Sequence, residues 1–310
     1  MLAIVCPGQG AQSPGMLGPW LEQPEMRHTI SELSAHAELD LAELGTQADA
    51  ETIRDTEVAQ PLLTAAAILS LQSLLGTGST AGVVGVAAGH SVGEIGAAVV
   101  AGVLDPAQAM VLARERGRAM ARAAQTEPTG MSAVVGGRPE EVQAALDAHG
   151  LTAANVNGGG QVVAAGSLPA LAALAAEPPA RARVVPLPVA GAFHTRFMAQ
   201  AVEHVRDVVA GLTPADPTLP LLSNADGAQV RTGTEAVERL VAQVSQPVRW
   251  DLCQEQLAAL GVTGMIELCP GGVLTGLARR SLRGVETVAI TTPDDLEPAR
   301  QLLTQHGGTR

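Results

Sequence analysis

The stretch Val83-Val84-Gly85-Val86-Ala87-Ala88-Gly89-His90-Ser91-Val92-Gly93 decides the fold. Its apolar part, Gly82–Ala88, is short and rich in Val, which predicts a buried strand. The apolar run from Val92 to Val103 predicts a helix that begins directly after the turn. A strand, a sharp turn and a helix in succession favour a parallel α/β sheet.

The turn Gly89–Gly93 has the G-x-S-x-G pattern of a nucleophile elbow. Glycine is needed on both sides because this strand-to-helix turn is strained and leaves little room near the serine backbone. The helix that follows offers backbone N–H groups, with that of Val92 as the donor to an oxyanion. In a Gly-rich chain the pattern can also be a plain tight turn, but its place between a strand and a helix favours catalysis. We predict that Ser91 is the nucleophile of an acyl-transfer enzyme.

A nucleophilic serine needs a base, and the chain has seven histidines. His194 is the best candidate, because it lies in a Gly-containing loop, Gly191–Thr195, after an apolar strand and before a helix. His90 adjoins the nucleophile, but neighbours in an elbow diverge, so we expect it to have a structural or pocket-wall role. The remaining histidines lie in polar segments or on a predicted helix face: His28, His36, His149, His204 and His306.

The rest of the chain alternates strands and helices. Leu2–Cys6 predicts a buried strand that enters the Gly-rich turn Pro7–Gly10. Residues 126–190 carry a β-α-β-α-β pattern, which predicts an inserted small sheet. The main sheet then resumes, with a strand at Gly264–Leu268. Predicted helices lie at Val58–Leu75, Pro106–Ala124, Pro139–His149, Leu168–Ala176, Met198–Gly211 and Glu235–Val244, and the predicted strands of the insertion at Met131–Val135, Gln161–Ala165 and Arg183–Pro188.

Composition restricts the class of protein. The 310 residues are 46% hydrophobic but only 1% aromatic, which is typical of a globular core built from Ala, Val and Leu. The net charge of −12 argues against broad affinity for nucleic acids or anionic membranes, which require a basic surface. Cys6, Cys253 and Cys269 are odd in number and far apart, and no signal peptide is evident. We therefore expect a cytoplasmic protein.

Several motifs occur together along the chain in a recognisable order. They are Gly8-Gln9-Gly10-Ala11-Gln12, Gly89-His90-Ser91-Val92-Gly93-Glu94, Arg116-Gly117, Gly191-Ala192-Phe193-His194, Pro247-Val248-Arg249-Trp250 and Glu267-Leu268-Cys269-Pro270-Gly271-Gly272-Val273-Leu274. This combination resembles the malonyl-CoA:acyl carrier protein transacylase family and, more broadly, the acyltransferase domains of fatty-acid and polyketide synthases. The resemblance covers essentially the whole chain.

The resemblance implies a fold of class α/β. Residues 1–125 and 191–310 would form an α/β-hydrolase-like catalytic core with a parallel sheet, and residues 126–190 an inserted ferredoxin-like α+β subdomain. It also implies a dyad of Ser91 and His194, with the base oriented by the backbone carbonyl of Gln243 in place of a catalytic Asp. Gln9 matches the second oxyanion donor of the family, through its backbone N–H. A plain Gly-rich turn is the alternative at that position.

The resemblance assigns substrate choice to Arg116, whose planar guanidinium can hold the free carboxylate of malonate with two parallel hydrogen bonds. On the sequence alone the pattern favours a solvated helix face for Arg116, as it does for Arg114, Arg118 and Arg122. Phe193 matches malonyl-selecting domains, whereas Gly191 departs from the His that such modules often have. Asn155 and Asn157 match an Asn-containing segment that supports the family's site, with Asn157 as the first choice.

The resemblance implies that a malonyl group passes from malonyl-CoA to the phosphopantetheine thiol of acyl carrier protein through a malonyl-Ser91 intermediate. No cofactor or metal is expected, and neither is a nucleic-acid or membrane partner; a monomer is expected. One alternative is a serine esterase or thioesterase that uses water as acceptor. Another is a non-catalytic subunit that binds the carrier protein. Candidate docking residues for the carrier are Arg181, Arg183, Arg196, Arg279, Arg280 and Arg283.

Overall fold

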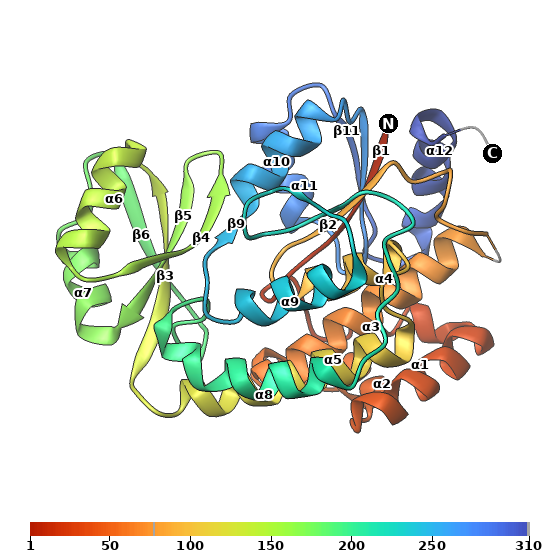
Figure 1. The fold of residues 1–310 in the computed structure, drawn as a ribbon, viewed down its shortest axis with the longest axis horizontal. Helices are drawn as coiled ribbons and strands as arrows, with labels where there is room; N and C mark the ends of the chain where they lie inside the picture. Colours follow the sequence, from red (N-terminus) through yellow and green to blue (C-terminus); the bar gives the residue numbers. More distant parts are fainter. Residues whose placement is uncertain (77, 309–310) are drawn as a thin grey trace.

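The computed structural model describes residues 1–76 and 78–308, which form two sheets and the helices packed against them (Figure 1). The larger sheet has six strands in the order β11-β10-β1-β2-β7-β8, and the smaller has five in the order β6-β3-β5-β4-β9. Strands of the larger sheet are β1 (Leu2–Cys6), β2 (Val86–Gly89), β7 (Leu221–Leu222), β8 (Gln229–Val230), β10 (Gly264–Glu267) and β11 (Glu286–Ala289). Strands of the smaller sheet are β3 (Thr129–Gly136), β4 (Thr152–Gly158), β5 (Gln161–Ser167), β6 (Ala182–Leu187) and β9 (Val248–Arg249).

The larger sheet is parallel from β11 to β7, and only β8 runs antiparallel to its neighbour. In the register of its central strands, Cys6 of β1 lies opposite Gly89 of β2, and Val5 of β1 lies opposite Glu267 of β10. Parallel strands end at the same edge of a sheet. The turn after β1, the elbow after β2 and the turn after β10 therefore meet at one edge.

Helices cover both faces of the larger sheet (Figure 1). Leu2 and Ile4 of β1 pack into the core on the side of α3 and α5, whereas Ala3 and Val5 pack on the other side, with α10 and α11. The strand is apolar at every position because it is buried on both faces. The α-helices are α1 (Pro24–Ala37), α2 (Leu41–Thr46), α3 (Thr56–Leu75), α4 (Gly93–Val100), α5 (Pro106–Ala124), α6 (Pro139–Ala148), α7 (Leu168–Ala176), α8 (Ala199–Ala210), α9 (Gly233–Gln243), α10 (Trp250–Ala259), α11 (Val273–Ser281) and α12 (Leu296–His306).

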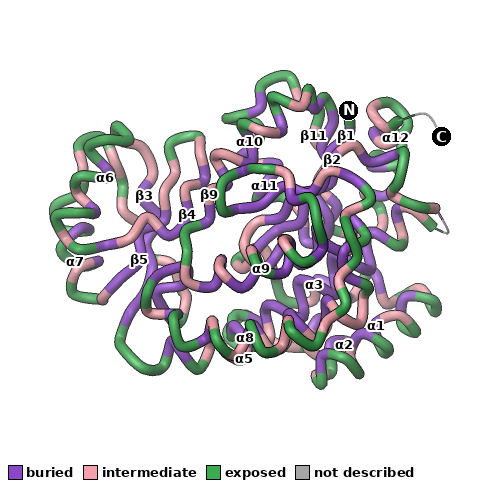
Figure 2. Tube along the Cα trace, in the orientation of Figure 1, coloured by how far each residue is buried: buried purple, intermediate pink, exposed green. Residues whose placement is uncertain are grey.

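Helix α3 is long and apolar enough to cross a membrane by length and composition, but 78% of its apolar window is buried inside the protein. It runs against α5, where Gly117 allows close approach: a Cβ at Gly117 would lie 2.8 Å from the backbone oxygen of Thr56. Figure 2 shows α3 and the central strands among the buried segments. Helix α3 is therefore a core helix, and it packs against α5, the helix that carries Arg116.

The smaller sheet is built from the succession β3-α6-β4-β5-α7-β6, with α6 and α7 on its outer face at the left of Figure 1. Its pairs β3–β5, β3–β6 and β4–β5 are antiparallel. The predicted fold class, a parallel α/β core with a small α+β subdomain, is confirmed. The pattern predicted three strands in this part and missed β4, whose sequence TAANVNG shows no clear apolar alternation. The boundary at residues 126–190 stays a prediction, and β9 joins this sheet from outside that range.

Candidate active site

The elbow after β2 holds Ser91 in the left-handed region, with φ of 55°. Glycine is required on both sides for steric reasons. A Cβ on Gly89 would lie 2.1 Å from the backbone carbonyl of Gly93, and a Cβ on Gly93 would lie 2.2 Å from the backbone oxygen of Cys6. Helix α4 begins at Gly93, directly after the turn. The sequence thus forces Ser91 to the edge of the sheet.

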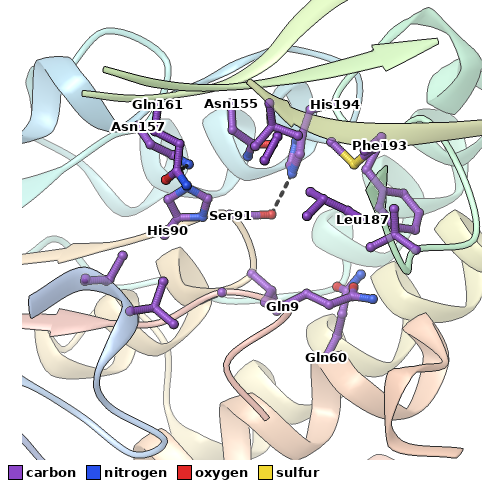
Figure 3. Close-up of a pocket in the computed structure, with 18 of the residues that line it drawn as sticks. Gln9, Gln60, His90, Ser91, Asn155, Asn157, Gln161, Leu187, Phe193 and His194 are labelled. Carbon is purple, nitrogen blue, oxygen red and sulfur yellow. Dashed lines mark hydrogen bonds between the residues drawn. The ribbon is translucent and has the colours of Figure 1, made fainter. Parts of the chain in front are cut away.

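Ser91 and His194 face one another across the site (Figure 3), with 2.7 Å between Oγ of the serine and Nε2 of the histidine. Nδ1 of His194 lies 2.8 Å from the backbone oxygen of Gln243. A hydrogen bond from Nδ1–H to that carbonyl leaves Nε2 free to accept the serine proton. Gln243 is the last residue of α9, so its carbonyl is one of those that a helix leaves without an intrahelical partner.

The base, His194, is buried. Its backbone adopts the left-handed conformation, with φ of 60°. Burial, together with the positive charge of Arg116, lowers the pKa of His194 to about 3, against the raising effect of the bond to Gln243. The imidazole is therefore neutral at physiological pH and able to accept a proton.

Two backbone N–H groups lie beside the nucleophile with no hydrogen-bond partner among the described residues: those of Gln9 and Val92. Gln9 follows β1, and its side chain is tied back to Thr56 and to the carbonyl of Arg54. Val92 stands at the N-terminus of α4, where the helix dipole is positive. Free donors at these two positions can hold an oxyanion formed next to Ser91.

Arg116 lies inside the protein, with 1% of its surface exposed, and lines the same cavity as Ser91. Its two terminal nitrogens donate to side-chain oxygens, Nη1 to Gln60 at 2.7 Å and Nη2 to Gln243 at 2.8 Å. Its Nε–H has no partner among the described residues. Burial lowers the pKa of Arg116 to about 10, although the charge of Glu94 acts to raise it. The guanidinium therefore stays charged at neutral pH. A buried cation with an unused donor is suited to an anionic ligand.

The cavity has a volume of about 220 Å³ and opens between the two sheets. Figure 3 shows Leu187 and Phe193 on one side of Ser91, and His90, Asn157 and Gln161 on the other. Its wall combines apolar side chains with these amides, a composition typical of a site for a small ligand. Within the described parts of the chain, no group of three or more His, Cys, Asp or Glu side chains could hold a metal ion.

His90 and Asn157 form a second hydrogen bond in the wall, with 2.8 Å between Nε2 of the histidine and Oδ1 of the amide. The His90 ring also packs edge-on against Trp250, with centroids 5.9 Å apart. Burial lowers the pKa of His90, so its ring is neutral as well. Asn155 also lines the cavity. The pattern-based expectation of a pocket-wall position for His90 agrees with this geometry.

Three buried polar residues at the site were missed by the sequence reasoning: Gln60, Glu94 and Asn224. Asn224 accepts from the backbone N–H of Ser91 at 2.8 Å, and the Glu94 carboxylate accepts from the side chain of Gln243. Burial raises the pKa of Glu94 to about 8, although the N–H of Asn224 and the charge of Arg116 act to lower it. No pattern marks Asn224 in the sequence, because the strand before it, β7, has two residues, too few to recognise as a strand.

The arginines proposed for docking are all exposed, and they lie on different elements. Arg279 and Arg280 are on the last turn of α11, the helix whose Leu274 and Leu277 line the cavity. Arg280 also lies beside the hairpin between β4 and β5, because a Cβ on Gly159 would be 3.3 Å from the Cβ of Arg280. The other four are Arg181, Arg183, Arg196 and Arg283.

Comparison with known proteins agrees with this geometry. Residues 3–300 match the acyl transferase domain family. The chain is 50% identical over 302 residues to the malonyl CoA-acyl carrier protein transacylase of Mycobacterium tuberculosis, covering 97% of this chain and 100% of that protein. It is 33% identical to the protein of the same name from Bacillus subtilis, covering 97% of each.

Solved structures of malonyl-transacylases are similar to this fold over nearly the whole chain. A crystal structure of the Mycobacterium tuberculosis enzyme superposes with a TM-score of 0.92 at 49% identity, covering 97% of this chain and 99% of the other. A malonyl-transacylase bound to a type II polyketide acyl carrier protein superposes with a TM-score of 0.89 at 31% identity, again covering 97% and 99%. This chain belongs to the acyl transferase family, among the malonyl CoA-acyl carrier protein transacylases.

Proposed function

We propose that this chain carries malonyl groups from malonyl-CoA to the phosphopantetheine thiol of acyl carrier protein, through a malonyl ester of Ser91. The observation that supports this most directly is the buried, charged Arg116 in the cavity that also holds Ser91. A cation with a free donor in that position favours an acyl group that ends in a carboxylate. The nucleophile and the base are already within hydrogen-bonding distance.

In the first half-reaction, Nε2 of His194 accepts the proton of Ser91 as its Oγ bonds to the thioester carbon. The carbonyl oxygen becomes an oxyanion, and the N–H groups of Gln9 and Val92 stabilise it. When the intermediate collapses, the carbon–sulfur bond breaks. The CoA sulfur takes the proton from His194 and leaves malonyl-Ser91.

In the second half-reaction, His194 accepts the proton of the phosphopantetheine thiol, whose sulfur attacks the ester carbon. Ser91 Oγ leaves and regains the proton, so the enzyme returns to its starting state and the cycle is ping-pong. Throughout, the carbonyl of Gln243 keeps the imidazole in the required tautomer. Arg116 holds the malonyl carboxylate, and Phe193 limits the space at the acyl α-carbon.

The supporting residues act on the shape of the cavity in this proposal. Asn157 fixes the ring of His90 through the bond between its Oδ1 and the ring Nε2, and the two together form the wall opposite Phe193. Asn155 adds a polar group to the same wall. None of these side chains takes part in proton transfer.

The test is to expose the protein briefly to malonyl-CoA, quench it in acid and analyse its peptides by mass spectrometry. We expect a malonyl adduct on the peptide that contains Ser91, and none in Ser91→Ala. An adduct on another peptide would contradict the mechanism. The absence of any adduct would favour a non-catalytic subunit that binds the carrier.

A serine hydrolase would form the same adduct, so product analysis must distinguish the two. With carrier protein present, malonyl should appear on the carrier thiol. Without it, malonyl-Ser91 should persist, with little free malonate. Rapid release of malonate in both samples would establish water as the acceptor.

We also propose a cytoplasmic monomer that takes its acceptor from fatty-acid synthesis, polyketide synthesis or both. The solved relative in complex with a polyketide carrier supports the second acceptor class. Parallel transfer assays with a fatty-acid carrier and a polyketide carrier would show which is used. Sedimentation velocity would report the oligomeric state.

A further inference from the structure

Asn224 takes no part in the mechanism above, although it lies fully buried behind the nucleophile. It belongs to the loop after β7, the strand that pairs with β2, so this loop runs beside the elbow. Its Oδ1 accepts from the backbone N–H of Ser91 at 2.8 Å, and its Nδ2 donates to the backbone oxygen of Gly89 at 2.7 Å. One side chain thus links the strand end to the nucleophile.

The conformation of Ser91 makes this link important. A non-glycine residue in the left-handed region is strained and persists only where the surrounding structure enforces it. The N–H of Ser91 donates to Asn224 and is therefore not available to an oxyanion. Without Asn224, this part-buried donor would lose its partner, and the elbow could relax to a conformation that turns Oγ away from His194.

Three further hydrogen bonds fix the position of Asn224. Its backbone N–H donates to Glu94 at 2.6 Å, and its backbone oxygen accepts from the N–H of Arg249 at 2.8 Å. Its Oδ1 also accepts from Nε2 of Gln243 at 3.1 Å. These donors fix the amide orientation, because a rotated amide would set its NH2 group against the N–H of Ser91.

We propose that Asn224 is a positioning residue for malonyl transfer, which holds Ser91 in the left-handed conformation that aims Oγ at His194. The inference rests on the proposed function. Asn224 does not line the cavity and has no bond to Arg116 among the described residues. It should therefore affect the rate of acylation and leave the choice of acyl group unchanged.

The experiment measures single-turnover formation of the acyl-Ser91 ester by rapid quench, with malonyl-CoA and with acetyl-CoA. In Asn224→Ala we expect the rate constant to fall about 30- to 100-fold with both substrates, since the N–H of Ser91 loses its partner and Oγ is no longer directed at His194. The KM for malonyl-CoA and the malonyl-to-acetyl ratio should stay unchanged.

Cys253→Ala is the matched control. The Cys253 sulfur is buried and lies 3.6 Å from Nδ2 of Asn224, but has no bond to the elbow. Removing this sulfur perturbs the residues around Asn224. The acylation rate constant of Cys253→Ala should nevertheless stay within about threefold of wild type. A loss equal to that of Asn224→Ala would mean that any disturbance of this core slows the enzyme, and would overturn the proposal.

The rate constant is the deciding quantity because partial unfolding lowers the amplitude of the burst and not its rate. A wild-type rate constant with a reduced amplitude would mean that Asn224 only supports the fold. If Asn224→Ala gives no folded protein, Asn224→Ser decides by the same measurement, since serine is too short to bridge Ser91 and Gly89. Failure of the wild-type protein to form malonyl-Ser91 would instead refute the proposed function.

Discussion

The base of this site is oriented by a backbone group: Nδ1 of His194 lies 2.8 Å from the carbonyl oxygen of Gln243. Among the described residues, no carboxylate is hydrogen-bonded to His194. Gln243 ends α9, where the helix dipole is negative, so the position can stabilise a transient imidazolium to a limited degree. The side chain of the same residue accepts from Arg116, so Gln243 contacts both the base and the proposed carboxylate-binding group.

Replacing Arg116 should change substrate preference. In Arg116→Ala, malonyl transfer should lose about 3–5 kcal/mol of transition-state stabilisation, a factor of a few hundred or more, because a malonyl carboxylate would have no partner in the cavity. Acetyl transfer should fall less than about tenfold. The measurement is kcat/KM with malonyl-CoA and acetyl-CoA.

Arg114→Ala on the same helix is the control, because Arg114 pairs with Glu38 and Glu115 outside the cavity. Both activities should stay near wild type in that variant. Equal losses with the two substrates in Arg116→Ala would remove Arg116 from substrate selection.

The pH dependence of acylation should reflect the low pKa of His194. Because burial and Arg116 lower that pKa to about 3, the base is deprotonated above it, and its activity is lost only as pH falls through this value. Single-turnover acylation by acetyl-CoA should therefore be flat from about pH 5 to pH 8.

In Arg116→Gln the base loses a neighbouring positive charge, so its pKa should rise and the acidic limb should move to higher pH. The comparison with wild type is made on kcat/KM for acetyl-CoA, which has no carboxylate to pair with Arg116. If kcat/KM of the wild-type protein fell with a midpoint near pH 6.5, the ordinary pKa of histidine, the base could not be deeply buried.

The glycines of the elbow should tolerate no side chain. Gly89→Ala places a Cβ 2.1 Å from backbone atoms of Gly93, a contact that only backbone movement can relieve. We expect a loss of about 1–3 kcal/mol or more in the free energy of unfolding and a near-complete loss of acylation. Chemical denaturation and burst amplitude measure the two effects.

Gly276→Ala is a matched glycine substitution within α11, where a new Cβ would meet no atom of the described residues within 4 Å. It should raise stability by up to about 1 kcal/mol through helix propensity and leave acylation unchanged. If Gly89→Ala were as active as Gly276→Ala, the steric account of the elbow would be wrong.

The parts of the fold that the sequence predicted well are those with local signals. The bounds of α5, Pro106–Ala124, were predicted to the residue, and the structure shows a capping box of Asp105 and Gln108 at the start of this helix. The elbow was equally clear, since two glycines flank Ser91 between a strand and a helix. By contrast, β4 was missed because its residues do not alternate.

The candidate site divides in the same way. Ser91 and His194 could be chosen from residue type and context, whereas the role of Gln243 came only from the resemblance, because every residue carries a backbone carbonyl. Asn224 lies 133 positions from the Ser91 N–H that it accepts from. Its contact depends on the register between β2 and β7, and the two-residue strand β7 is too short to recognise from a pattern.

Docking of the carrier protein requires a surface of this chain near the mouth of the cavity. Arg279 and Arg280 are exposed at the end of α11, whose other face lines the cavity, and Arg280 lies beside the β4–β5 hairpin. Since this chain carries a net charge of −12, attraction of an acidic carrier protein should depend on such local positive charge.

In the double variant Arg279→Glu and Arg280→Glu, we expect kcat/KM for the carrier to fall about tenfold or more at low salt, with a smaller difference at high salt. Acylation by malonyl-CoA alone should be unchanged. Arg138→Glu is the control, because Arg138 is 74% exposed at the start of α6, on the outer side of the smaller sheet. A parallel loss in the acylation step would indicate a contact with the CoA phosphates instead of the carrier, and an unchanged kcat/KM for the carrier would remove these arginines from docking.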